Sequence, residues 1–149
     1  MTEDQELYFQ VLSRAFDDFG IDNFSPEEFA PFRRPPPQYH RTLAILPTVS
    51  VLQDMRDAGC GPITVNSGYR DPGYNESVGG ARESQHILFT AADVTTRDWS
   101  PDEVFEWLDG HHNRKGIALG RYKTFTHIDT RHWYGNPQEG WSPARWDNR

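Results

Sequence analysis

The chain has 149 residues, 36% of them hydrophobic and 13% aromatic, which suffices for one domain with a buried core but is too short for two. Its formal net charge of −7 argues against a nucleic-acid-binding protein, because phosphates are neutralised by a basic face and here Lys and Arg are outnumbered and scattered. A single cysteine, Cys60, excludes an intrachain disulfide and a four-cysteine zinc site.

The first part of the chain is predicted to be helical. Hydrophobic residues recur at near-helical spacing over residues 6–19, which predicts an amphipathic helix ending near Gly20. Residues 25–29 read as a short helix with Ser25 as N-cap, Pro26 in the first turn and Glu28 completing a capping box. The three prolines at 35–37 indicate a stiff connector across the surface. A second long helix is predicted over residues 46–57.

Strands are predicted mostly later in the chain. The β-branched residues 63–67 indicate a strand, and residues 67–75 are dense in turn residues and read as a loop. Residues 91–95 read as a short buried strand, and a helix is expected from Ser100 through Leu108, closed by Asp109 and Gly110. One or two further strands are expected within residues 116–128. This order predicts an α+β fold with a small antiparallel sheet on which the helices pack.

Two imidazoles and one carboxylate, those of His86, His127 and Asp93, form a ligand set that suits a catalytic zinc ion with one open position. Because side chains alternate along a strand, Asp93 and His127 are expected side by side on neighbouring strands, with His86 reaching in from the segment before the first. Zinc held there lowers the pKa of a bound water to around 7. Spacing alone leaves open that these are ordinary structural or surface side chains.

The motifs around these residues resemble, in order and over roughly residues 23–134, those of the zinc D-alanyl-D-alanine carboxypeptidase and murein endopeptidase family (peptidase M15-like). The fold of that family is shared with lysostaphin-type endopeptidases and the hedgehog signalling domain. The matching motifs are Ser67-Gly68-Tyr69-Arg70 with Tyr74-Asn75 and Val78-Gly79-Gly80-Ala81, Ser84-Gln85-His86, Ala91-Ala92-Asp93, Gly120-Arg121-Tyr122 and Phe125-Thr126-His127-Ile128-Asp129-Thr130-Arg131.

The resemblance implies roles for residues on the substrate side. His86, Asp93 and His127 are implied to bind one Zn²⁺ ion. Arg70 is implied to bind or polarise the substrate carbonyl and to stabilise the oxyanion of the transition state. Tyr69 and Ser84 are implied to contact the substrate. The alternative for Arg70 is a salt bridge within its loop to Asp71 or Glu83.

The implied organisation is a hedgehog/D,D-peptidase-like domain over residues 23–149, preceded by an N-terminal helical extension over residues 1–22. The domain includes a tail with Trp133, Trp141 and Trp146, which either lines a sugar-binding groove or folds back over the core, and we favour the second. The acidic N-terminus does not look like a signal peptide, and no apolar run approaches membrane-spanning length. We therefore expect a soluble protein without membrane insertion.

The implied activity is zinc-dependent hydrolysis of D-amino-acid-containing stem or cross-link peptides of bacterial peptidoglycan. The small size and acidic charge fit a phage-encoded enzyme, made in the host cytoplasm and acting at the cell wall during lysis or as a virion component, where other virion proteins would be partners. The alternative is a virion structural or binding protein that keeps the fold without catalysis. A hedgehog-like partner-binding domain ranks last.

The general base is open, because many members of this family carry an acidic residue three positions before the last histidine and here that position is Thr124. Asp129 is the first candidate for a catalytic carboxylate, although two residues along a strand span about 7 Å. The alternative is that Asp129 orients a ligand or pairs with Arg131. Glu83 and His132 are the remaining candidates.

Other residues have simpler interpretations. Phe89 stands where the family pattern has glycine, which suggests a rearranged loop in which Leu88 and Phe89 narrow the pocket or form a contact surface. Cys60 reads as a small packed thiol. His111 and His112 read as a solvated helix end without a functional role, and His40 has none either.

Overall fold

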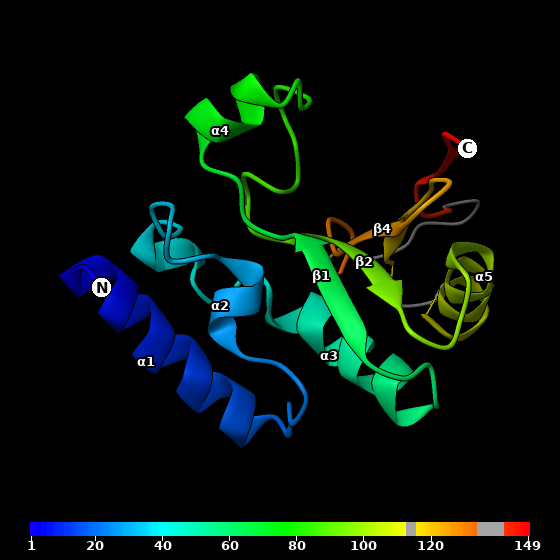
Figure 1. Ribbon diagram of the computed structural model, residues 1–149, viewed down its shortest axis with the longest axis horizontal. Coiled ribbons are helices and arrows are strands. Elements are labelled where there is room, and N and C mark those ends of the chain that lie inside the picture. Colours follow the sequence, from blue (N-terminus) through cyan, green and yellow to red (C-terminus); the bar gives the residue numbers. More distant parts are fainter. Residues whose placement is uncertain (113–115, 134–141) are drawn as a thin grey trace.

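The computed structural model of the protein describes residues 1–112, 116–133 and 142–149 (Figure 1). The helices are α1 (Glu3–Asp18), α2 (Pro26–Phe29), the 3₁₀ turn η1 (Tyr39–Arg41), α3 (Leu46–Asp57), α4 (Pro72–Ser77) and α5 (Pro101–His112). The strands are β1 (Ile63–Ser67), β2 (Ala91–Thr96), β3 (Ala118–Arg121), β4 (Thr126–Asp129) and β5 (Arg145–Asp147).

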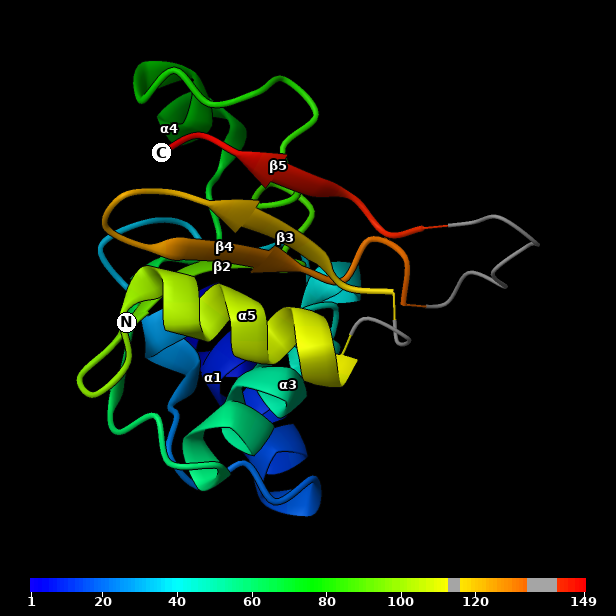
Figure 2. The ribbon, with the colours of Figure 1, turned by 90° about the vertical axis from the view of Figure 1, so that its right-hand side faces the viewer.

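The strands form one five-stranded sheet in the order β1-β2-β4-β3-β5. All neighbours pair antiparallel except β3 and β5, which run parallel. Helices α1, α3 and α5 lie on one side of this sheet, and α4 stands beyond its other side (Figure 2). The predicted fold class, a single α+β domain with a small and mostly antiparallel sheet, is confirmed.

The core lies between the sheet and the helices. Alternate residues of the central strands, among them Val94, Leu119 and Ile128, belong to the same buried cluster as Leu12 of α1 and Leu52 of α3. Because successive strand residues point to opposite faces, the residues between them in sequence, including the expected metal ligands of β2 and β4, are directed away from the helices. The alternation of apolar residues along β2 and β4 therefore places the site on the face of the sheet opposite the helices.

Helix α1 is fixed at both its start and its buried face. Thr2 and Gln5 form a reciprocal capping box at the N-terminus, and the side chain of Gln5 also donates to the carbonyl oxygens of Phe32 and Arg34. The Tyr8 hydroxyl donates to the carbonyl oxygen of Pro26 at 2.7 Å. Residues 1–22 thus pack on the same core as the rest, and their boundary as an extension stays a prediction.

Three expectations about the elements are wrong. The loop expected over residues 67–75 contains the start of α4, because the Asp71 carboxylate accepts from the Tyr74 amide and caps a helix beginning at Pro72. Helix α5 continues past Gly110 to His112. His112 is buried rather than solvated, whereas the neighbouring His111 is exposed and stacks on Trp107.

The tail contributes a strand that the sequence did not indicate. Strand β5 pairs with β3, and Trp146 lies beside Gly120 in that pairing. The partly buried Trp133 packs against the core, as expected, while Trp141 lies outside the described residues. Among the described helices, none is long and apolar enough to span a bilayer.

Candidate active site

The site is built on one row of residues that crosses the whole sheet. Ser67 of β1 lies opposite Asp93 of β2, Asp93 opposite His127 of β4, His127 opposite Gly120 of β3, and Gly120 beside Trp146 of β5. Residues opposite one another on neighbouring strands share a face of the sheet. The register therefore places Asp93 and His127 side by side, as the alternation of the two strands had predicted.

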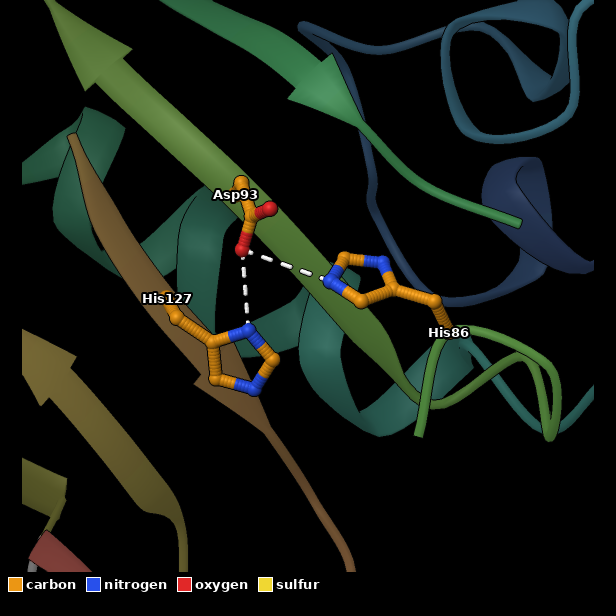
Figure 3. A group of neighbouring side chains, drawn as sticks. All are labelled: His86, Asp93 and His127. Carbon is orange, nitrogen blue, oxygen red and sulfur yellow. Dashed lines mark hydrogen bonds and ion pairs between the residues drawn. The ribbon is translucent and has the colours of Figure 1, made fainter. Parts of the chain in front are cut away.

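His86 completes a buried trio with these two side chains (Figure 3). One carboxylate oxygen of Asp93, Oδ1, lies 2.8 Å from Nδ1 of His127 and 3.4 Å from Nε2 of His86. One ligand atom from each residue lies within 4.8 Å of the others. The exposed fractions of His86, Asp93 and His127 are 4%, 7% and 8%. The trio is a group that could hold a metal ion.

The orientation of His86 depends on a close approach between two backbones. Its Nδ1 lies 2.7 Å from the carbonyl oxygen of Gly68, so a proton on Nδ1 donates there and leaves the lone pair of Nε2 facing Asp93. The Tyr69 amide in turn donates to the carbonyl oxygen of Phe29 at 2.7 Å, and a Cβ on Gly68 would lie 2.3 Å from that oxygen. Only glycine fits at residue 68 in this arrangement.

His127 is oriented by a carboxylate. Its Nε2 lies 2.8 Å from Asp129 Oδ2, and the fully buried Asp129 also accepts from the Arg131 guanidinium at 2.9 and 2.8 Å. Burial alone would raise the pKa of Asp129, but the hydrogen bonds from His127 and Arg131 outweigh it and lower the pKa to about 2. An ionised Asp129 keeps the His127 proton on Nε2 and frees Nδ1 as a ligand atom.

Each imidazole thus directs one ring nitrogen toward the Asp93 carboxylate, while its other nitrogen is held by an acceptor on the opposite side of the ring. A proton on a nitrogen that faces Asp93 would be released when a metal ion binds there. Burial acts to raise the pKa of Asp93, and the hydrogen bonds from His127 and His86 outweigh it and hold that pKa well below its usual range. Two nitrogens and an anionic oxygen, supported by outer hydrogen bonds, are the donor set of a zinc site with an open position. The residues present fit the expected ion.

A family model described as peptidase M15 matches residues 19–129. The chain belongs to the peptidase M15 family. That family consists of peptidases that are generally zinc-dependent, and the resemblance drawn from the motifs is confirmed. No curated protein matches the chain. The match ends at Asp129, so strand β5 lies outside the matched residues.

Arg70 of this M15 peptidase lies beside the trio, with its Nη2 3.6 Å from Asp93 Oδ2. Its other contacts are to Ser67 Oγ at 3.2 Å and Asn75 Oδ1 at 3.4 Å. The alternative partner Asp71 pairs with Arg34 instead, at 2.8 Å. The contacts of Arg70 are all long, and its side chain is 19% exposed, so the guanidinium is held in place yet accessible to a ligand.

The trio of His86, Asp93 and His127 opens into a cleft of about 470 Å³. Besides the trio, its described lining consists of Arg70, Val78, Gly79, Gly80, Ala81, Glu83, Ser84, Gln85, Tyr122, Phe125, Arg131 and Trp146. Ser84 is therefore placed where the resemblance implied. Tyr69 is outside this lining, and its ring packs edge-on against Phe89 with centroids 5.8 Å apart.

The candidate general bases are now separated by position. Thr124 is exposed, in the turn between β3 and β4, and outside the lining. Asp129 is fully buried with both oxygens hydrogen-bonded, which favours orientation of His127 over proton transfer. His132 is also outside the lining, against Gly116. Glu83 is the one carboxylate, apart from Asp93, among the described residues that line the cleft.

Phe89 does not narrow the cleft. It has a φ of +58°, the one positive value among the described non-glycine residues, and thereby keeps the backbone conformation for which glycine is suited. Its ring is fully buried between Tyr8 and Tyr69, with centroid distances of 5.9 and 5.8 Å. The expectation that Phe89 lines the pocket or a contact surface is therefore wrong.

Sequence reasoning gave no site role to Tyr122 and Phe125, which line the cleft from the turn between β3 and β4. It favoured packing over the core for Trp146, which lines the cleft from β5. It also gave no role to Asn75, which lies outside the lining but supports it. Asn75 is buried and bridges Arg70 to the carbonyl oxygen of Ala81. The signal for Trp146 was Gly120, since a glycine inside a strand often marks a close approach. A Cβ on Gly120 would lie 2.4 Å from the Trp146 indole.

Proposed function

We propose that this M15 protein is a zinc-dependent peptidase that hydrolyses D-amino-acid-containing peptide bonds of bacterial peptidoglycan. The observation that carries the proposal is the buried trio of His86, Asp93 and His127, with both imidazoles oriented by outer acceptors, at the base of an open cleft that also contains Arg70. The peptidoglycan assignment is supported by the order of the motifs along the chain, which resembles that of murein peptidases.

The protein's own groups have separable tasks in this reaction. Zinc bound by the trio would supply a water with a pKa near 7 and polarise the substrate carbonyl. Arg70 directs its guanidinium into the same cleft and is suited to bind the carbonyl oxygen as negative charge develops on it. Glu83 is our proposed proton carrier, which accepts a proton from the attacking water and delivers it to the leaving amine.

Asp129 takes a positioning role in this proposal. Its carboxylate accepts from Nε2 of His127 and thereby fixes the tautomer of that ring. The Arg131 guanidinium balances the negative charge of Asp129, which can therefore stay ionised although it is fully buried. Ser84 contributes to the same wall as Glu83, and its hydroxyl accepts from the His86 amide at 3.2 Å. Ser84 is therefore proposed to contact substrate, while Tyr69 supports the loop from behind.

A binding protein of the virion that keeps the fold without catalysis is the second candidate. The observation that favours it is the exposed Thr124, which leaves the usual position of the general base without a carboxylate. Phe89 no longer supports this candidate, because the ring lies in the core and the backbone keeps a positive φ. In either case we propose a phage origin, action at the host cell wall and contact with other virion proteins.

The test combines metal content with digestion. The purified full chain should contain one zinc per molecule and should release new amino termini from purified peptidoglycan, and His86→Ala should abolish both. Glu83→Gln should keep zinc but lower the rate by about 10²–10⁴-fold. The matched control is His40→Ala, since His40 is an exposed histidine outside the cleft lining. Stoichiometric zinc without released amines would refute the peptidase and favour the binding protein.

A further inference from the structure

Trp146 is the residue of the C-terminal strand β5 that lines the cleft. In the row across the sheet it follows Gly120, and its indole occupies the space that a side chain on Gly120 would take. The indole centroid lies 5.0 Å from that of the His127 ring, with the ring planes at 48°. An aromatic surface thus stands directly beside one of the proposed metal ligands.

The indole is held in one orientation by its neighbours. Its Nε1–H donates to the Tyr122 hydroxyl at 3.1 Å, and the Tyr122 ring stacks on Phe125 with centroids 4.3 Å apart and planes at 12°. The Arg131 guanidinium lies 5.6 Å from the indole centroid. The polar atom of Trp146 is thereby satisfied within the protein, and what the ring offers to the cleft is apolar.

The rest of the cleft differs in character from this aromatic wall, which consists of Tyr122, Phe125 and Trp146. The charged groups of the lining are those of Arg70, Glu83, Asp93 and Arg131, and residues 78–81 supply small side chains and backbone. The α4 segment follows β1 at one edge of the sheet, and β5 forms the opposite edge (Figure 1). A peptide lying over His86, Asp93 and His127 would pass between the aromatic wall and residues 78–81.

We propose that Trp146 is a specificity-determining residue that contacts the substrate, and that the aromatic wall receives an apolar side chain next to the bond that is cleaved. This inference rests on the proposed peptidase function. A charged side chain at that position is disfavoured, because the aromatic wall would remove its water and the nearby Arg131 guanidinium is already paired with Asp129.

The experiment compares tryptophan variants of the zinc-loaded full chain. The bond cleaved by the wild type is first identified by mass spectrometry of digested muropeptides. Synthetic peptides are then made with alanine or glutamate next to that bond. We expect the alanine peptide to be preferred over the glutamate peptide by about 10-fold or more, and Trp146→Ala to lower kcat/KM for the alanine peptide by about 10–100-fold through a rise in KM. Trp146→Phe should retain most of the activity.

The matched control is Trp107→Phe, which makes the same change at a partly buried tryptophan on α5, outside the cleft lining. Its kinetics should equal those of the wild type. Zinc content and the thermal midpoint are measured for each variant. Trp146→Ala that holds zinc and cleaves as well as the wild type overturns the inference. Loss of zinc from Trp146→Ala also overturns it, since the indole would then only support His127.

If the wild type cleaves no peptide, the proposed peptidase function fails, and the role of Trp146 is tested by binding instead. The dissociation constants of muropeptides for the zinc-loaded chain are then compared instead of rates. Binding that weakens about 10-fold in Trp146→Ala would support the wall although the peptidase proposal had failed. Equal binding by the wild type and Trp146→Ala, or no binding by the wild type, would refute the proposed contact between Trp146 and the substrate.

Discussion

At residue 89, replacement of phenylalanine by glycine should destabilise the protein less than replacement by alanine. Phe89 combines a fully buried ring with a φ of +58°, so each substitution removes the same ring but only alanine keeps a Cβ in the left-handed region. At most buried positions alanine is the better tolerated of the two. At residue 89 we expect glycine to be the better tolerated.

The magnitudes follow from the contacts. Loss of a buried phenylalanine ring costs about 3–5 kcal/mol of unfolding free energy, here including its contacts with Tyr8 and Tyr69. The left-handed backbone costs a residue with a Cβ about 1 kcal/mol more than glycine. Phe89→Ala should therefore destabilise the protein by about 3–5 kcal/mol and Phe89→Gly by about 2–4 kcal/mol.

Equilibrium urea unfolding of both variants measures the difference, provided that the two transitions have equal slopes. The comparison pair is Leu12→Ala and Leu12→Gly, at a fully buried side chain in the interior of α1, where glycine should be worse than alanine by about 1 kcal/mol. The reasoning is refuted if Phe89→Gly proves less stable than Phe89→Ala, because the positive φ would then have no energetic consequence.

Three further predictions concern the site and its supports. Asp129→Asn, which removes the anion that orients His127, should weaken zinc affinity about 10–100-fold in a competitive chelator titration, and unchanged affinity would exclude the positioning role. Gly80→Ala places a Cβ 2.1 Å from Oδ1 of Asn75 and should lower kcat/KM about 10–100-fold with zinc retained; wild-type kinetics would show that Asn75 does not position the cleft. Burial raises the pKa of Asp71, but the hydrogen bonds that it accepts outweigh this and lower it, so its stabilisation exists above about pH 4 and is lost as the pH falls through the lowered pKa. Asp71→Ala should thus cost about 1 kcal/mol at pH 7 and much less near pH 2 in urea unfolding, and an equal cost at both values would contradict the assignment.

Local patterns predicted the elements whose signals lie within one segment. The bounds of α3 and β1 agree with their predictions, because an apolar repeat ending at Gly59 and a β-branched run are visible in the sequence itself. The neighbouring positions of Asp93 and His127 followed from strand alternation. These features need no knowledge of the tertiary structure.

The features that were missed depend on contacts between distant segments. Strand β5 has three residues and no apolar periodicity, so it exists only because β3 offers an edge to pair with. The role of Gly68 depends on the Phe29 carbonyl oxygen, and the fit of Phe89 depends on a space between Tyr8 and Tyr69. A departure from the family pattern at residue 89 could therefore not be interpreted before its neighbours were known.

The row of site residues across the five strands has a consequence for folding. Shifting any of these pairings by one residue would turn that strand's member of the row toward the helices, and the ligands would no longer meet. A metal ion that binds all three ligands therefore binds the correct pairing of β2 with β4 and discriminates against shifted ones, by the free energy of its own binding. The ion expected for the reaction would in this way also act as a check on assembly of the sheet.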